Sequence, residues 1–189
     1  MPQFILDNIK KYESQPEIML SSLQLSPSNG LNLEFGVFNG TSINLCSEKH
    51  SNRIFYGFDS FEGLPEDWRE GFSKGCFSTG GVLPNVNSNV RLIKGLFCET
   101  LDNFLANQVD NVSFLHIDCD LYSSTKYVLL KLKDRLIKGT IILFDEFYNY
   151  PGYENGEYKA WTEFAQESSI NFEYIGYNVN HEQVALMIA

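Results

Sequence analysis

The spacing of apolar residues changes near residue 31 of the chain. Before it, apolar positions recur at the intervals of two short helices that are separated near Pro16. After it, short apolar stretches alternate with amphipathic ones, which is the order of a parallel sheet covered by helices on both faces. We therefore predict an N-terminal helical cap over residues 1–30 and one α/β domain over residues 31–189.

Seven of the apolar stretches have the length and composition of strands. They cover residues 31–35, 54–58, 90–93, 112–117, 140–144, 172–177 and 184–188. The last two are joined by residues 178–183 alone, too few for a parallel crossover, so we expect an antiparallel hairpin at the sheet edge. The predicted fold is a doubly wound, seven-stranded, mostly parallel α/β sheet of the Rossmann-like type with a reversed edge strand.

The connections between these strands are of two kinds. Four of them contain amphipathic helices, predicted over residues 40–50, 99–108, 123–137 and 157–168. We expect Ser123 or Ser124 to be the N-cap of the third. Residues 63–89 are rich in Gly, Ser, Pro and Asn and show no period. Because this stretch also contains Trp68 and Phe72, we predict an active-site lid rather than a disordered loop.

Charge and cysteine content limit the partners of the chain. The formal net charge of −10 repels nucleic acid and anionic membranes, and no basic stripe offsets it, so we expect neither as a partner. The four cysteines match no zinc-ligand spacing and should be free thiols. Without a signal-type segment or a run of about 18 apolar residues, a soluble cytoplasmic protein is expected. The oligomeric state stays open, with a homodimer as one alternative.

A turn with two glycines, Gly36 and Gly40, follows the first predicted strand and leads into a helix. Glycines allow close backbone approach, and the helix N-terminus presents free N–H groups. Such a turn either binds a nucleoside or merely connects strand to helix. Asp59, at the end of the second strand, is suited to bind ribose hydroxyls, with Phe61 against the adenine ring. The alternative role for Asp59 is that of a turn or cap residue.

Glu34 distinguishes between nucleoside ligands. A dinucleotide site uses Gly-x-Gly-x-x-Gly around pyrophosphate, but this turn has two glycines and a carboxylate that would repel pyrophosphate. That carboxylate suits the ammonium and sulfonium groups of S-adenosylmethionine, which we predict as the cofactor. The predicted cofactor-binding residues are Glu34, Gly36, Gly40, Asp59, Ser60 and Phe61.

Carboxylates follow the fourth and fifth predicted strands. Asp118 and Asp120 come after the fourth, and Asp145 and Glu146 after the fifth. If these strands are neighbours, the four carboxylates meet at one edge of the sheet, where Mg²⁺ or a similar hard cation would stabilise them. The alternative is that they are solvated, cap helices or bind polar groups without metal. We expect His116 to be buried and to point away from Asp118.

Five segments form an ordered series of motifs, over residues 33–40, 57–65, 94–101, 116–125 and 139–146. This series resembles the class I methyltransferases of the macrocin O-methyltransferase type, which methylate sugar hydroxyls in macrolide and aminocoumarin pathways. The resemblance implies a Mg²⁺-dependent O-methyltransferase with Asp118, Asp145 and Glu146 as metal ligands and Asp118 as the catalytic base. Glu146 stands where the family usually has Asp.

These observations together favour transfer of a methyl group from S-adenosylmethionine to a hydroxyl of a small molecule, a sugar being the acceptor that the resemblance implies. Tyr122, Tyr148, Tyr150 and Tyr153 are candidates for the acceptor pocket or for packing of the lid. Two other functions are open: a nicotinamide-dependent oxidoreductase, which the glycine pattern disfavours, and a non-catalytic nucleoside-binding module.

Overall fold

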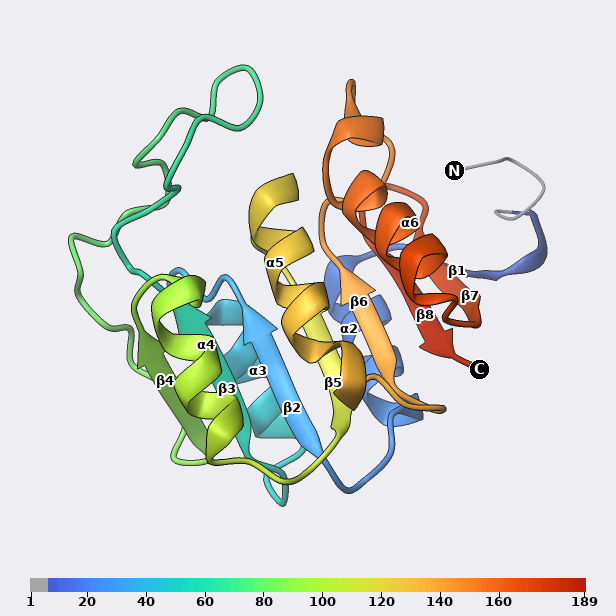
Figure 1. Ribbon diagram of the computed structural model, residues 1–189, viewed down its shortest axis with the longest axis horizontal. Coiled ribbons are helices and arrows are strands. Elements are labelled where there is room, and N and C mark those ends of the chain that lie inside the picture. The colour runs from blue at the N-terminus through green and yellow to red at the C-terminus, as the bar shows by residue number, and fades with distance from the viewer. Residues whose placement is uncertain (1–6) are drawn as a thin grey trace.

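The computed structural model describes residues 7–189, which fold around one eight-stranded sheet (Figure 1). The strands are β1 (Lys10–Tyr12), β2 (Leu31–Phe35), β3 (Phe55–Asp59), β4 (Val90–Lys94), β5 (Val112–Ile117), β6 (Ile141–Phe144), β7 (Phe172–Asn178) and β8 (Val184–Ile188). The helices are α2 (Gln15–Leu25), α3 (Thr41–Lys49), α4 (Phe97–Ala106), α5 (Tyr122–Leu132) and α6 (Glu157–Ser168), with short 3₁₀ turns η1 (Lys133–Arg135) and η2 (Tyr153–Asn155).

The strands lie in the order β1-β7-β8-β6-β5-β2-β3-β4. From β4 to β6 all neighbours are parallel, whereas β8 is antiparallel to both β6 and β7. The mostly parallel sheet and the antiparallel C-terminal hairpin are therefore confirmed, and each of the seven predicted strands is present. The order reverses between β5 and β2, so that the carboxyl ends of these two strands flank the switch point where ligands bind in such sheets.

The N-terminal segment differs from its prediction, because an eighth strand is present. Lys10–Tyr12 pairs in parallel with β7, so β1, and not the hairpin, forms the edge of the sheet. Gly176 makes room for this strand, since a Cβ there would lie 2.5 Å from the Tyr12 ring. Of the two predicted helices, the second is α2, and Pro16 lies in its first turn, where proline is tolerated. The first falls largely on residues 1–6, outside the described part.

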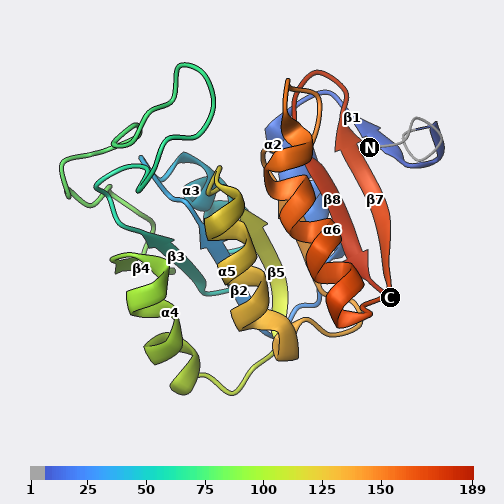
Figure 2. The ribbon, with the colours of Figure 1, turned by 45° about the horizontal axis from the view of Figure 1, so that its top comes forward.

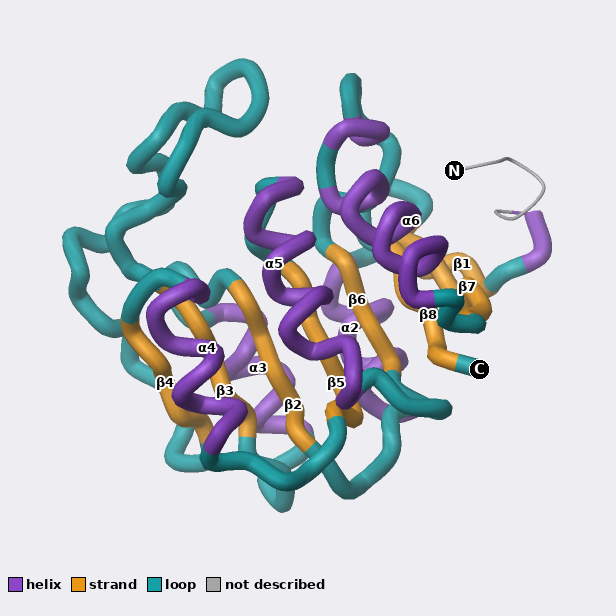
Figure 3. Tube along the Cα trace, in the orientation of Figure 1, coloured by secondary structure: helices purple, strands orange, loops and turns teal. Residues whose placement is uncertain are grey.

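Helices cover both faces of the sheet (Figures 2 and 3). On one face α4, α5 and α6 pack on a large apolar cluster, and on the other α2 and α3 pack on a smaller one. The alternation along β6 makes this visible, because Ile142 and Phe144 belong to the first cluster while Ile141 and Leu143 belong to the second. The central strands are thus buried on both faces, as a parallel sheet requires.

Residues 63–89 form a long irregular segment that extends beyond the carboxyl ends of the strands (Figure 1). A side-chain contact fastens it to the start of α5, where Ser123 donates a 2.6 Å hydrogen bond to Glu66. Ser123 or Ser124 was predicted to be the N-cap of this helix, which is wrong, because α5 begins at Tyr122 and Leu121 occupies the N-cap position. The hydroxyl of Ser123 is therefore free to hold the segment rather than the helix end.

Two further expectations concern the whole chain. All four cysteines are free thiols, as predicted. Among the helices of residues 7–189, none combines the length and the apolar character needed to span a membrane.

Candidate active site

A cavity of about 640 Å³ opens at the carboxyl ends of the parallel strands, a size typical of small-molecule sites. Its walls come from the turn after β2, the ends of β3 and β5, the start of α4, and the 63–89 segment. Gln15 from the N-terminal region and Glu146 from the end of β6 complete the lining. The cavity therefore lies at the switch point predicted from the strand pattern.

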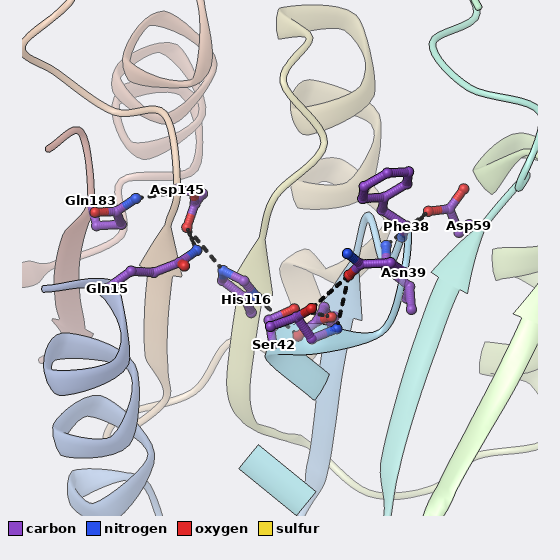
Figure 4. Close-up of polar contacts among 11 residues, drawn as sticks. Gln15, Phe38, Asn39, Ser42, Asp59, His116, Asp145 and Gln183 are labelled. Carbon is purple, nitrogen blue, oxygen red and sulfur yellow. Dashed lines mark hydrogen bonds and ion pairs between the residues drawn. The ribbon is translucent and has the colours of Figure 1, made fainter. Parts of the chain in front are cut away.

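Asp59 organises the glycine turn. Its Oδ2 accepts hydrogen bonds of 2.8 Å from the backbone N–H groups of both Val37 and Phe38 (Figure 4). Its Oδ1 accepts one of 2.7 Å from Phe61 N–H. The turn role that the sequence left as an alternative is thus the one observed. Asp59 also lines the cavity, so its remaining acceptor capacity faces any ligand bound there.

The backbone at position 36 requires glycine, whether or not a ligand is bound. Its φ is +93°, and a Cβ at this position would lie 1.6 Å from the carbonyl oxygen of Asp118. No other residue can be accommodated, because the turn after β2 crosses directly over the end of β5. The sequence left two roles open for the glycines, close approach to a ligand or a tight turn from strand to helix. Gly36 does line the cavity, whereas Gly40 does not and serves as the left-handed N-cap of α3.

Glu34 supports the turn from below and does not line the cavity. It is buried, accepts a 2.8 Å hydrogen bond from the Ser42 hydroxyl, and lies 3.0 Å from His116 Nδ1. Ser42, in contrast, lines the cavity. Of this hydrogen-bonded pair, Ser42 thus faces the cavity, and Glu34 holds Ser42 and the turn from the buried side.

The aromatic surface of the cavity differs from the prediction. Phe61 has a φ of +60° and a fully buried side chain packed in the smaller core cluster, so its ring does not face the cavity. The rings that do line the cavity include Phe97, at the start of α4, and Phe38, in the glycine turn. Ser60 lines the cavity as predicted. Phe97 lies in the motif over residues 94–101, which was noted in the sequence but assigned no role.

The carboxylates after β5 and β6 converge, as predicted. Ligand oxygens of Asp118, Asp120 and Glu146 lie within 4.8 Å of one another, and all three residues line the cavity. Burial, and then the negative charge of Asp145, raises the pKa of Asp118 and of Glu146 well above the ordinary values. The same causes raise the pKa of Asp120 to about 7. When these three carboxylates are ionised, the neighbouring positive charges and hydrogen-bond donors do not balance their negative charge.

Asp145 is in a different environment from its neighbours. Its Oδ1 accepts a 2.6 Å hydrogen bond from Gln15, its Oδ2 accepts one of 3.0 Å from Gln183, and His116 Nε2 lies 3.5 Å from Oδ1 (Figure 4). Burial opposes ionisation, but His116 and the two amides outweigh it, so the pKa of Asp145 lies below its ordinary value. Asp145 does not line the cavity.

His116 is buried, as expected, but its predicted direction was wrong. It lies on the same side as Asp118, and the two side chains share a group of polar atoms with Asp145. The reason is that residues two apart along a strand face the same side of the sheet. Although burial alone would lower it, the contacts of His116 with Asp145 and Glu34 raise its pKa well above the ordinary value. His116 therefore lies buried between two carboxylates that favour its protonated form, and its Nε2 has no hydrogen-bond partner among the described residues.

Glu157 is a fifth carboxylate that the sequence did not reveal. It lies fully buried in the first turn of α6, and its Oε2 accepts a 3.2 Å hydrogen bond from Glu146 N–H. Glu157 Oε1 and Glu146 Oε2 are buried without a hydrogen-bond partner among the described residues. Burial raises the pKa of Glu157 well above its ordinary value. In the sequence this residue is indistinguishable from a solvated glutamate at a helix start.

None of the four tyrosines proposed for the acceptor pocket lines the cavity, whereas Tyr127 does. Tyr122 and Lys126 have a Tyr-x-x-x-Lys spacing that also occurs as a catalytic pair in oxidoreductases. Here both bind Glu163 of α6, at 2.6 and 2.7 Å, and neither faces the cavity. They therefore give no support to the oxidoreductase alternative.

The lid segment is anchored across the cavity by Arg69, which lines it. The guanidinium lies 4.0 Å from the ring centre of Trp68 and 4.4 Å from that of Tyr150. Its Nη1 is 3.1 Å from both carboxylate oxygens of Glu182, in the turn between β7 and β8. This cation joins the lid to the C-terminal hairpin over the acidic end of the cavity.

Comparisons with known proteins agree with this geometry. A profile of the macrocin-O-methyltransferase (TylF) family matches residues 27–178. No curated protein sequence matches the chain. The crystal structure of CalS11, a calicheamicin methyltransferase, is similar with a TM-score of 0.71 and 22% identity, covering 92% of this chain and 76% of that one. The O-methyltransferase NovP has a TM-score of 0.69 and 21% identity, with 92% and 78% covered.

A third similar structure is the MycE methyltransferase from the mycinamycin biosynthetic pathway in complex with Mg and SAH, with a TM-score of 0.58 and 13% identity. Its match covers 92% of this chain and 49% of that one. At these identities the structural similarities establish the fold, and the profile match over most of the chain establishes the family. The chain therefore belongs to the macrocin-O-methyltransferase (TylF) family, and it is an S-adenosylmethionine-dependent methyltransferase.

Proposed function

We propose that this enzyme transfers the methyl group of S-adenosylmethionine to a hydroxyl of a small, hydroxylated acceptor, with a sugar as the acceptor class. The observation that carries the proposal is the contact of Gly36 with the Asp118 carbonyl, which brings the cofactor turn and the acidic cluster to one cavity. The family supports a hydroxyl acceptor, and a sugar is supported by CalS11, whose structure without ligand is described as that of a TDP-rhamnose 3'-O-methyltransferase in calicheamicin biosynthesis.

The proposed reaction is an in-line displacement. A bond forms between the acceptor oxygen and the methyl carbon as the bond from carbon to sulfur breaks, and S-adenosylhomocysteine is the second product. The proton of the acceptor hydroxyl passes to Asp118, which lines the cavity beside the turn. Burial and neighbouring carboxylates raise the pKa of Asp118, which makes its carboxylate a stronger base than a solvated one.

A hard divalent cation such as Mg²⁺ fits the acidic end of the cavity. The donor set contains only oxygen, and Glu146 Oε2 is buried with no hydrogen-bond partner among residues 7–189. The family resemblance assigns the cation to Asp118, Asp145 and Glu146, and MycE was solved with Mg. A bound cation would offset the crowded negative charge and favour the ionised form of the acceptor hydroxyl.

The methyl donor is tested first by ligand-induced thermal stabilisation. S-adenosylhomocysteine should raise the unfolding temperature, because a ligand stabilises the fold that binds it, whereas NAD should not. Release of S-adenosylhomocysteine is then measured with a panel of sugars, glycosides and phenols in the presence of Mg²⁺. Binding without turnover on any acceptor would favour the alternative of a non-catalytic nucleoside-binding module.

A further inference from the structure

Two groups of possible cation ligands share Asp118. One joins it to Asp120 and Glu146 on the cavity side, and the other joins it to His116 and Asp145 on the buried side. In both groups the ligand atoms lie within 4.8 Å of one another, so distance alone does not separate them. The hydrogen bonds of the four carboxylates distinguish the two groups.

Both oxygens of Asp145 are occupied by N–H donors, and for Oδ2 the orientation of the donor is fixed. The backbone N–H of Asn180 can only donate, and it donates to Asn178 Oδ1 at 3.0 Å. The amide nitrogen of Asn178 consequently faces Gln183 Oε1 at 2.7 Å, which turns the amide nitrogen of Gln183 toward Asp145 at 3.0 Å. A cation at Oδ2 would therefore meet an N–H group that the surrounding chain cannot reverse.

The other oxygen of Asp145 is no more accessible to a cation. Oδ1 receives the 2.6 Å hydrogen bond from Gln15 and has His116 Nε2 at 3.5 Å. Since His116 Nδ1 also lies 3.0 Å from Glu34, the ring is held between two carboxylates, with Nδ1 toward Glu34 and Nε2 toward Asp145. A cation at Oδ1 would therefore have to displace the amide of Gln15 and lie against the His116 ring.

Asp120 and Glu146 have the opposite character. Both line the cavity, and neither carboxylate accepts a hydrogen bond from the described residues. Glu146 Oε2 is buried and unpartnered, a state that is unfavourable for a polar atom and more so for a charged one. The neighbouring cation Arg69 is already bound by both oxygens of Glu182. Among residues 7–189, no side chain or backbone group thus provides a hydrogen bond or an ion pair to these two carboxylates.

We propose that the divalent cation of this enzyme is held by Asp118, Asp120 and Glu146, and that Asp145 is a positioning residue that holds His116 and Gln183 in place. This assignment rests on the proposed function, since it specifies how the acidic end of the same cavity binds metal. It replaces Asp145 in the predicted ligand set by Asp120, and it leaves the methyl-donor end of the cavity unchanged.

The test replaces each disputed carboxylate by a thiol and uses Co²⁺ as the probe. A thiolate bound to Co²⁺ gives a charge-transfer absorption in the near ultraviolet, which a thiol elsewhere does not. Co²⁺ is titrated into the full chain with S-adenosylhomocysteine present, for Asp120→Cys and for Asp145→Cys. The unmodified enzyme is the control for its own cavity cysteines, Cys98 and Cys119.

The assignment predicts the absorption band for Asp120→Cys and its absence for Asp145→Cys. In a parallel Mn²⁺ titration, Asp120→Asn should weaken binding by more than about 100-fold. Asp145→Asn should stay within about 10- to 100-fold, which is the range for residues that orient ligands. Glu167→Gln, on the exposed side of α6, should change nothing.

A thiolate band for Asp145→Cys would overturn the assignment, as would a missing band for Asp120→Cys when Co²⁺ still binds. An enzyme that binds no divalent cation would overturn both this assignment and the proposed metal dependence. The methyl donor is judged separately, because the affinity for S-adenosylhomocysteine is measured in every sample. Retained affinity also shows that each variant is folded.

Discussion

The two ends of the cavity differ in how their carboxylates are satisfied. At the glycine turn, three backbone N–H groups donate to Asp59, and Glu34 has a partner on each oxygen. At the acidic edge, Glu146 and Glu157 each keep a buried oxygen without a partner in the described part of the chain. The glycine turn, which we call the donor end because it faces the predicted methyl donor, is therefore organised by the protein alone. The acidic end keeps carboxylate oxygens without partners, which a ligand or a cation would bind.

Two contacts connect these ends. The first is the close approach of Gly36 to the Asp118 carbonyl, and the second is the buried path from Glu34 through His116 to Asp145. The first contact joins the backbones of two residues that line the cavity, and the second lies behind the lining, so the ends share a scaffold although their side chains are satisfied separately. The predictions below separate the ends, in order of decreasing effect.

The largest effect is expected for Asp118→Asn, which keeps the shape of the side chain but removes its basicity. General-base catalysis contributes about 10² to 10⁴-fold, so methyl transfer should fall by about 1000-fold. The affinity for S-adenosylhomocysteine should stay within about threefold, because the donor end is organised separately. Turnover is measured by product release and affinity by calorimetry. Asp110→Asn, at an exposed position, is the control, and full activity of Asp118→Asn would refute the proposed base.

Gly36→Ala should damage both ends at once, through the backbone. The added methyl group would lie 1.6 Å from the Asp118 carbonyl oxygen at a φ of +93°, so we expect a loss of about 3 kcal/mol or more in the free energy of unfolding. Gly71→Ala is the matched control, because Gly71 has a φ of +88° but nothing within 4 Å, and it should lose about 1 kcal/mol. If urea denaturation shows equal losses of stability for Gly36→Ala and Gly71→Ala, the backbone of Gly36 is not in tight contact with Asp118.

Asp59→Asn should break the donor end only. An amide offers one acceptor oxygen where the carboxylate offers two, so at least one of the three backbone N–H groups loses its partner. This should cost about 2 kcal/mol of stability and weaken S-adenosylhomocysteine binding about tenfold. The affinity for Mn²⁺ at the acidic edge should not change. If cation affinity falls with cofactor affinity, the two ends are not independent.

The acidic edge should make the stability of the metal-free enzyme depend on pH. The folded-state pKa of Asp120 is about 7, above the ordinary value of 3.8, and the pKa values of Asp118 and Glu146 are raised as well. A raised carboxyl pKa favours folding below the ordinary value, and this benefit is lost as pH rises through the folded-state pKa. Between pH 4 and 7 the free energy of unfolding should thus fall, on the order of 2 kcal/mol.

Calorimetry across this pH range, with and without Mg²⁺, measures the effect. A bound cation should flatten the dependence, because it stabilises the ionised carboxylates. Asp120→Asn should reduce the dependence without metal. A stability that rises with pH over the whole range in the metal-free enzyme would contradict the interpretation of the acidic edge as uncompensated.

The fold was largely predictable because the central strands are buried on both faces and read as apolar runs. β1 was missed since Lys10-Lys11-Tyr12 has no strand pattern of its own and is held by its pairing with β7. The convergence of Asp118 and Glu146 was predictable for a similar reason, because parallel strands bring their carboxyl ends to one edge.

The partners of these carboxylates were not predictable. Gln15 binds Asp145 across 130 positions of sequence, and no local pattern marks either residue for that contact. Phe61 was assigned to the cofactor from its place after β3, but its positive φ turns the side chain into the core. Sequence position identifies which residues reach the site, whereas side-chain direction and long-range pairing are set by tertiary packing.

The smallest effect is expected at the lid. Arg69→Lys keeps the positive charge near Glu182 but loses the planar group that lies against Trp68 and Tyr150. Loss of about 1 kcal/mol of lid anchoring corresponds to about a fivefold rise in KM for the acceptor. The kcat and the affinity for S-adenosylhomocysteine should not change, since neither the base nor the glycine turn contacts Arg69. Arg91→Lys, on the outer strand β4, is the control. A fall in kcat with unchanged KM would instead place Arg69 in the chemical step. The lid would then act together with the carboxylates of the acidic end.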